Sequence, residues 1–363
     1  MARILFYIVQ DYYWESLEPV YAVYAAEGCH DLYIKIGKNQ RRVGGVFLIS
    51  DRSRLEAEYR RRGYRITSAT SGFDVVFLGA QIAQPERFGN ATLVNLDHGP
   101  GIKTLRYRHL LKQQNVCYHC FVEGRYRLEK FKKYGLDKIH KIYVTGLPKL
   151  DCFFDGSFEK QVLIRKYGLN PDKKTVLYAP SFKPTSIFMV GEQIAGLARN
   201  YNVIIKLHPY SWQGKYASHS HHRFFEKMIR KNRNLYLVRP EQHDIRPFLF
   251  IADTMISDGS SVLNEFLALE RVGIIVDLPD EQQTHHDGTP LLEDRSSEWL
   301  KESFVHLRAG DNLEKAVQTA LNPEPERKEA LKRDKAYIFE YTDGSSARRV
   351  KHVVDSLLND DLA

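Results

Sequence analysis

The second half of the chain contains two adjacent serines placed where a protein can hold a phosphate. The run Ser257-Asp258-Gly259-Ser260-Ser261 follows the apolar stretch 248–256 and precedes 262–269, whose apolar residues are spaced as on one face of a helix. Serine hydroxyls beside the N–H groups of a helix start can bind an anion, and a glycine lets the backbone approach it. Taken alone, the pattern favours a simple helix cap formed by Asp258, Ser260 or Ser261, because such caps are common.

Two histidines stand at the ends of predicted strands. The apolar stretch 203–207 leads into His208-Pro209, and the stretch 92–96 leads into Asp97-His98-Gly99. Ligands of open α/β sheets bind at the carboxyl ends of the strands. The three strand ends therefore indicate one site with two histidines and a phosphate cradle, with a buried structural histidine as the alternative at each position.

Five short motifs extend this pattern from about residue 90 to 270. They are His98-Gly99-Pro100-Gly101-Ile102-Lys103-Thr104, Gly146-Leu147-Pro148-Lys149-Leu150-Asp151, Val176-Leu177-Tyr178-Ala179-Pro180-Ser181-Phe182-Lys183, Lys206-Leu207-His208-Pro209 and Asp258-Gly259-Ser260-Ser261-Val262-Leu263-Asn264-Glu265. In type and order they resemble the motifs of the CDP-glycerol glycerophosphotransferases, the family of teichoic-acid primases and polymerases. Asp97 and Gly259 stand where the family has tryptophan and tyrosine. Lys149 and Lys206 replace arginines, which keeps the charge but loses bidentate phosphate geometry.

The resemblance implies an enzyme that transfers an alditol phosphate, here glycerol phosphate, from a CDP-activated donor to an acceptor hydroxyl and releases CMP. The product would be a teichoic-acid-like surface polymer. The resemblance implies His98 as general base for the acceptor and His208 as the group that binds or protonates the phosphate. It also implies that Ser260 and Ser261 hold the pyrophosphate and that Glu265 reaches the ribose. The full expected donor site is Lys206, Asp258, Gly259, Ser260, Ser261, Glu265, Pro180 and Ser181, with Gly99 and Lys103 as further contacts.

No cofactor or metal is expected. The core of the chain has no Asp-x-Asp motif. Cys117 and Cys120 lie in the segment 116–122, which is predicted to be a strand, so their side chains would face opposite ways. The cysteines are therefore predicted to be reduced structural thiols.

Two other functions are compatible with parts of the sequence. A glycosyltransferase or related sugar-nucleotide enzyme of the GT-B type, using a UDP- or CMP-sugar, would share the strand-end sites. Nucleic-acid binding is supported only by the positive net charge, because the sequence contains no nucleic-acid recognition motif. No nucleic-acid partner is therefore predicted.

The composition suits a basic enzyme with two cores. The chain has 363 residues, of which 43% are hydrophobic, and a formal net charge of +8. No signal peptide or membrane span is recognisable, so the protein is expected in the cytoplasm, peripheral at the inner face of the cell membrane. Its partners would be CDP-glycerol or a similar CDP-alditol, a lipid-linked saccharide or growing polymer, and anionic lipid. The basic stretches 60–62 and 125–133 could meet that lipid or be ordinary solvated helix faces.

Strand and helix patterns alternate twice along the chain, with a restart near Asp155-Gly156. Such alternation predicts parallel sheets covered by helices. We therefore expect two Rossmann-like domains facing across a cleft (GT-B type), namely an acceptor-side domain at 1–155 and a nucleotide-donor domain at 156–340. A terminal helix at 341–363 would pack back on the first domain. Expected elements include a strand at 45–49 and a helix at 55–62.

Overall fold

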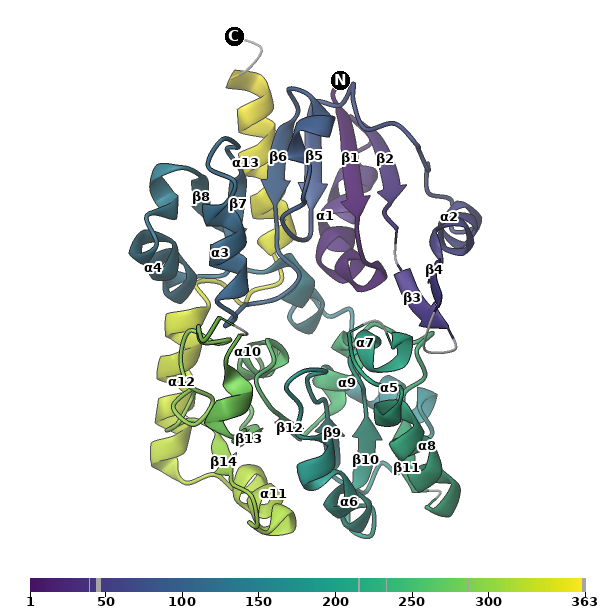
Figure 1. Ribbon diagram of the computed structural model, residues 1–363, viewed down its shortest axis with the longest axis vertical. Coiled ribbons are helices and arrows are strands. Elements are labelled where there is room, and N and C mark those ends of the chain that lie inside the picture. Colours follow the sequence, from purple (N-terminus) through teal and green to yellow (C-terminus); the bar gives the residue numbers. More distant parts are fainter. Residues whose placement is uncertain (39, 44–46, 215, 233, 286, 361–363) are drawn as a thin grey trace.

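The fold consists of two parallel sheets, one above the other, with the chain's ends at the same side (Figure 1). The computed structural model describes residues 1–38, 40–43, 47–214, 216–232, 234–285 and 287–360. The strands are short and buried on both faces, as continuous apolar runs predict for parallel sheets covered by helices.

The first sheet has six parallel strands in the order β2-β1-β5-β6-β7-β8. They are β1 (Arg3–Ile8), β2 (Asp31–Ile36), β5 (Val75–Leu78), β6 (Thr92–Asn95), β7 (His119–Val122) and β8 (Lys141–Val144). Its helices are α1 (Trp14–Glu27), α2 (Arg52–Arg61), α3 (Leu105–Leu111) and α4 (Arg125–Lys133). Between β2 and α2 the chain forms a separate antiparallel hairpin of β3 (Gln40–Val43) and β4 (Phe47–Ser50).

The second sheet also has six parallel strands, in the order β11-β10-β9-β12-β13-β14. They are β9 (Thr175–Tyr178), β10 (Asn202–Ile205), β11 (Leu235–Leu237), β12 (Thr254–Ser257), β13 (Ile274–Val276) and β14 (Val305–Leu307). This is the strand order of a Rossmann fold. Its helices are α5 (Lys160–Lys166), α6 (Ile187–Leu197), α7 (Pro209–Gln213), α8 (Ser220–Lys231), α9 (Arg246–Ile251), α10 (Val262–Leu267), α11 (Leu313–Leu321) and α12 (Pro325–Ile338).

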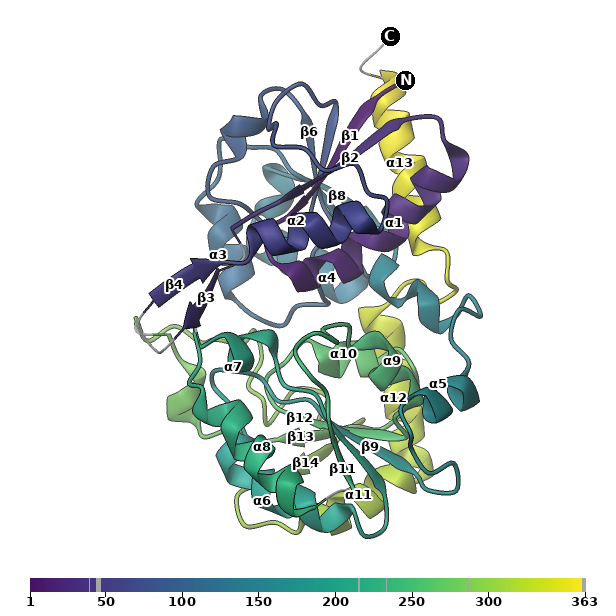
Figure 2. The same cartoon turned by 90° about the vertical axis from the view of Figure 1, so that its right-hand side faces the viewer.

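The C-terminal helix α13 (Ser346–Asp360) returns to the first sheet and packs beside α1 (Figures 1 and 2). Val350 and Val354 are buried in the core of the first domain. The hydroxyl of Tyr24 donates a hydrogen bond of 3.0 Å to Asp355. The predicted fold class, with two Rossmann-like domains and a returning terminal helix, is therefore confirmed. The exact domain boundaries stay predictions.

Several local expectations differ from the structure. The helix expected at 55–62 begins at Arg52, and the strand expected at 45–49 begins at Phe47, while Gly45 and Val46 lie outside the described residues. β7 begins at His119, so Cys117 precedes the strand. All four cysteines are free thiols. Among the described residues, no cluster of His, Cys, Asp and Glu is arranged to hold a metal ion, and no helix is long and apolar enough to cross a bilayer.

Candidate active site

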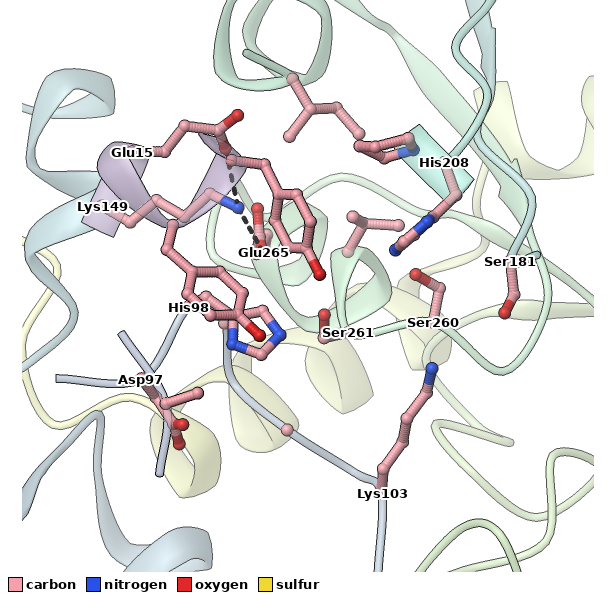
Figure 3. A pocket seen from close by; sticks show the side chains of 18 of the residues that line it. Glu15, Asp97, His98, Lys103, Lys149, Ser181, His208, Ser260, Ser261 and Glu265 are labelled. Carbon is pink, nitrogen blue, oxygen red and sulfur yellow. Dashed lines mark hydrogen bonds and ion pairs between the residues drawn. The ribbon is translucent and has the colours of Figure 1, made fainter. Parts of the chain in front are cut away.

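A cavity of about 410 Å³ lies between the two domains, where the strands of both sheets end. All of the predicted site residues except Asp258 and Gly259 line it. Further lining residues that were not predicted include Tyr12, Tyr13, Glu15, Gln81, Asp97, Arg106 and Lys149. Figure 3 shows the two histidines and the serines facing this common space.

The cavity lies at the point in each sheet where the strand order reverses. In the second sheet this point is between β9 and β12, whose ends lead to Pro180-Ser181 and to Ser260-Ser261. In the first sheet it is between β1 and β5, which are followed by Tyr12-Tyr13 and by Gln81. Crevices at such switch points are where open α/β sheets bind their ligands, so the fold directs both domains toward one ligand site.

His98 follows β6 and is fixed by the first domain. Its Nδ1 lies 3.1 Å from the carbonyl oxygen of Gly79. A carbonyl only accepts, so Nδ1 carries the proton and Nε2 has a free lone pair. Burial, with help from the charges of Lys149 and Lys103, lowers the pKa of His98 to about 4. The ring is therefore neutral at physiological pH and can accept a proton at Nε2.

His208 has the opposite tautomer. It precedes α7, and its Nδ1 accepts a hydrogen bond of 3.1 Å from the backbone N–H of Tyr210. The proton of the neutral ring must then be on Nε2. Burial and the nearby charges of Lys103 and Lys206 hold the pKa of His208 well below its ordinary value. His208 can therefore donate a hydrogen bond to a phosphate oxygen while His98 accepts one from a hydroxyl.

Two tyrosines of the short helix η1 (Asp11–Tyr13) hold the histidines in place. Tyr13 stacks on His98 with ring centroids 4.5 Å apart. Tyr12 lies between the histidines, at 5.8 Å from His98 and 5.7 Å from His208. The histidines were identified because they follow the carboxyl ends of strands. Tyr12 and Tyr13 follow the first strand of the chain, so the same rule could have identified them.

Two lysines supply positive charge to the cavity. Lys206 is buried, and its burial lowers its pKa to about 8, so most of the population is still protonated at neutral pH. Burial also lowers the pKa of Lys103, although the charge of Asp258 opposes this shift. Both ammonium groups suit an anionic ligand, because a phosphate would offset the cost of their desolvation.

Asp258 lies behind the cavity, where it orders the loop that follows β9. Its carboxylate accepts hydrogen bonds from the backbone N–H of Ser181 at 2.7 Å and from the N–H and hydroxyl of Ser186, both at 2.8 Å. This network positions Ser181, which does line the cavity. Gly259 packs near Leu292, where an added Cβ would come within 3.1 Å of that side chain.

Glu265 forms part of a buried ion-pair network that joins the two domains. Lys149 Nζ lies 3.0 Å from Glu265 Oε1 and 3.2 Å from Glu15 Oε2, and Figure 3 shows the lysine between the two carboxylates. Burial raises the pKa of Glu15 to about 7, against the opposing charge of Lys149. Glu265 Oε2 is buried and has no hydrogen-bond partner among the described residues. This oxygen is the one that a ligand hydroxyl could meet.

Gly99 allows the two domains to approach closely beside the histidines. A Cβ at this position would come within 3.0 Å of Ser261 Oγ and 3.1 Å of Glu265 Oε1. The neighbouring carbonyl of Pro100 accepts a hydrogen bond of 3.1 Å from Asn264 Nδ2. The first-domain loop that carries His98 is thus joined directly to the second-domain helix that follows the serines.

Comparison with known protein families gives one match that covers most of the chain. Residues 85–356, about three quarters of the sequence, match the model of the CDP-glycerol:poly(glycerophosphate) glycerophosphotransferase family.

Similar curated proteins come from Bacillus spizizenii and Staphylococcus aureus. The teichoic acid poly(ribitol-phosphate) polymerase of Bacillus spizizenii is 25% identical over 214 residues, which are 54% of this chain and 31% of the relative. The teichoic acid poly(glycerol phosphate) polymerase of the same species is 26% identical over 195 residues, which are 50% of this chain and 46% of the relative. The chain spans less than half the length of these relatives.

Solved structures show the same fold at low identity. The wall teichoic acid polymerase TagF superposes with a TM-score of 0.67 at 14% identity, covering 99% of this chain and 90% of that one. The S. aureus MnaA–UDP complex superposes with a TM-score of 0.58 at 12% identity, covering 99% and 97%.

Proposed function

The chain belongs to the CDP-glycerol:poly(glycerophosphate) glycerophosphotransferase family, and from that premise we propose that it transfers an alditol phosphate from a CDP-alditol, most directly CDP-glycerol, to an acceptor hydroxyl. The observation that carries this proposal is the pair of histidines with opposite tautomers facing one cavity. His98 offers a lone pair at Nε2 and His208 offers an N–H at Nε2. Phosphoryl transfer to a hydroxyl needs one group of each kind.

The donor binds against the second domain. Its diphosphate lies by Ser260 and Ser261, with Lys103 and Lys206 neutralising its charge. His208 donates its Nε2 proton to a phosphate oxygen. The cytidine extends toward Pro180 and Ser181, at the end of β9. Glu265 Oε2, which has no hydrogen-bond partner among the described residues, accepts from a ribose hydroxyl.

The acceptor hydroxyl approaches from the first domain. His98 Nε2 takes its proton as the oxygen attacks the phosphorus of the alditol phosphate. A new O–P bond forms, the P–O bond to the CMP phosphate breaks, and CMP leaves with the negative charge that His208 and the lysines stabilise. The bound diphosphate raises the basicity of the buried His98, because negative charge favours the protonated ring.

The physiological acceptor is a lipid-linked saccharide or a growing alditol-phosphate polymer, and the protein meets it at the anionic inner face of the cell membrane. The relatives named above support this acceptor class, because their names are those of teichoic acid polymerases. The excess of 53 Lys and Arg over 45 Asp and Glu supports the attraction to an anionic surface.

The test is turnover and donor affinity of His98→Ala and His208→Ala. Loss of a general base lowers kcat by about 10²–10⁴. His98→Ala should show this loss in release of CMP from CDP-glycerol, while calorimetry shows nearly unchanged donor affinity. His208→Ala should lose both kcat and donor affinity, because it contacts the phosphate.

His352→Ala is the matched control, because His352 is exposed on α13, away from the cavity. All variants are compared at matched thermal stability. Turnover near that of the wild type in both active-site variants would show that the histidines have structural roles only.

A further inference from the structure

The hairpin β3–β4 is the part of the molecule that the proposed chemistry does not use. It pairs only with itself among the described residues and joins neither six-stranded sheet. Figure 2 shows it projecting at the edge of the molecule, at the level where the two domains meet. A two-stranded hairpin alone is only marginally stable in water. Packing of this hairpin against another surface would therefore stabilise it.

The hairpin exposes apolar side chains on both of its strands. Phe47 is 71% exposed, Leu48 50%, and Val43 and Ile49 39% each. These are four of the eleven large hydrophobic side chains that are exposed among the described residues. On the second domain, Phe188 and Tyr216 extend the patch, because they line the same surface hollow as Arg42 of β3.

The same segment carries a concentrated positive charge. Residues 38–62 contain eight Lys or Arg (Lys38, Arg41, Arg42, Arg52, Arg54, Arg60, Arg61, Arg62) and three Asp or Glu (Asp51, Glu56, Glu58), a net charge of +5. The whole chain has a net charge of +8. Exposed apolar side chains flanked in the sequence by an excess of basic residues match the interface of an anionic bilayer. They do not match a second copy of this chain, whose equal charge would repel them.

The hairpin also lies near the active-site cavity. β3 packs beside α7, the helix that begins directly after His208 and whose first residue, Pro209, lines the cavity. Contact of the hairpin with a bilayer would therefore bring this side of the cavity close to the membrane surface, where a lipid-linked acceptor is found. The matched family region begins only at residue 85, so the hairpin lies outside it.

We propose that the β3–β4 hairpin, with the basic residues around it, is the membrane-docking element of this protein and inserts Phe47 and Leu48 into the headgroup region of an anionic bilayer. The proposal rests on the proposed function, because an enzyme that acts on a lipid-linked acceptor must reach the membrane. The molecules that contact the hairpin are anionic phospholipids.

The test is sedimentation of the full chain with phosphatidylcholine vesicles, with and without phosphatidylglycerol. The wild type binds only the vesicles that contain phosphatidylglycerol. Phe47→Ser/Leu48→Ser weakens that binding by at least about tenfold, because two apolar side chains no longer enter the headgroup region. Arg42→Glu weakens it by about tenfold at low salt, and added salt narrows the difference from the wild type.

Helix α5, on the second domain, offers matched controls. Val162 is 45% exposed and Arg165 is exposed on the same helix, so Val162→Ser and Arg165→Glu repeat both chemical changes away from the hairpin. Both controls should bind vesicles like the wild type. The hairpin variants should keep the wild-type melting temperature, since they change exposed side chains.

Donor affinity and transfer to a water-soluble acceptor are measured on the same variants and should stay at the wild-type level. Vesicle binding that is unaffected by the hairpin substitutions, or equal on both kinds of vesicle, overturns the docking proposal. Self-association through the hairpin without vesicle binding overturns it as well. Absence of CDP-glycerol turnover in the wild type would instead contradict the proposed function and leave the vesicle result standing.

Discussion

Two parts of the cavity, the Ser181 loop of the second domain and the His98 ring of the first, are held by different forces. In the second domain a buried carboxylate, Asp258, fixes the loop of Ser181 through three hydrogen bonds. In the first domain the ring of His98 has one hydrogen bond to a carbonyl and is otherwise held by stacking on Tyr13. Hydrogen bonds to a buried charge fix direction, whereas ring contacts allow small displacements. In the proposed reaction the Ser181 loop serves the donor side and His98 the acceptor side, so the donor side is the more constrained of the two.

The test with the largest expected effect removes Lys149, which links Glu15 of the first domain to Glu265 of the second. Lys149→Met removes the ion-pair partner of the buried Glu15 and Glu265, and removing one partner of a buried ion pair costs about 3–5 kcal/mol. Urea unfolding at neutral pH should show this loss in the free energy of unfolding. Lys301→Met, which removes only an exposed lysine, should change it little.

The pH dependence of the Lys149→Met cost follows from the raised pKa of Glu15. A carboxyl whose pKa is raised on folding binds more protons in the folded state, so it stabilises below its ordinary pKa of 4.5 and loses that effect as pH rises. Without Lys149 the pKa rises further. Glu15 is protonated in both folded proteins below about pH 7, so the cost should be smallest there and grow as pH rises above it. A cost that is constant with pH would exclude the ion-pair explanation.

A second test asks whether the donor side is fixed by Asp258. Asp258→Asn replaces one acceptor oxygen by an N–H that faces other donors, which should lower the free energy of unfolding by about 2 kcal/mol. Calorimetry should also show weaker binding of CMP, because Ser181 is displaced. Asp280→Asn serves as the control, since its side chain is 66% exposed. Full CMP affinity in Asp258→Asn would mean that this loop does not position the nucleotide.

A third test addresses the acceptor side. An aromatic pair contributes about 0.5–1.5 kcal/mol beyond its buried area, so Tyr13→Leu should lower kcat by up to about tenfold through loss of the stacking on His98. Donor affinity should not change. Tyr337→Leu, on α12, removes a partly exposed tyrosine elsewhere. Equal losses of kcat and donor affinity in Tyr13→Leu would place Tyr13 on the donor side.

The smallest expected effect is a shift of the pH–rate profile. A general base works in its neutral form, so activity falls as pH drops through its pKa, which is about 4 for His98 in the free protein. Lys103 lowers the pKa of both histidines. Lys103→Met should therefore move the acidic limb of kcat/KM upward, by no more than about one unit. A downward shift would contradict the assignment of His98 as base.

The sequence was sufficient to predict the elements with long apolar runs and the residues that follow them. The strands predicted at 92–96 and 203–207 are found at Thr92–Asn95 and Asn202–Ile205, and His98 and His208 follow strands of different sheets as expected. These predictions succeed because a strand that is buried on both faces is a continuous apolar run in the sequence. The residues after its carboxyl end are then candidates for ligand binding.

The features that the sequence analysis misses are contacts between residues far apart in the sequence and elements with a weak local pattern. The Glu15–Lys149–Glu265 contacts join residues more than a hundred positions apart, so no local pattern indicates them. The sequence analysis predicts one strand at 45–49 and misses its partner β3, although the Gly44-Gly45 dipeptide between two short runs is a known hairpin signal. Asp258 was expected at the ligand, but burial and three internal hydrogen bonds occupy it.

The chain crosses between the domains twice, once after β8 and once before α13, and the two crossings are fastened to each other. Asp151 of the first crossing accepts hydrogen bonds from the backbone N–H groups of Ser346 at 3.0 Å and Ala347 at 2.8 Å on the second. Gly146 permits this approach, since a Cβ there would come within 3.3 Å of Tyr341.

A joint made of two tethered segments resists torsion, because twisting one domain against the other would stretch one crossing while it compresses the other. These tethers therefore favour bending over twisting in any motion of one domain against the other. A polymer end that enters beside His98 and a CMP that leaves beside His208 would share one path of motion. Each catalytic cycle would return the two histidines to the same alignment without any further guide.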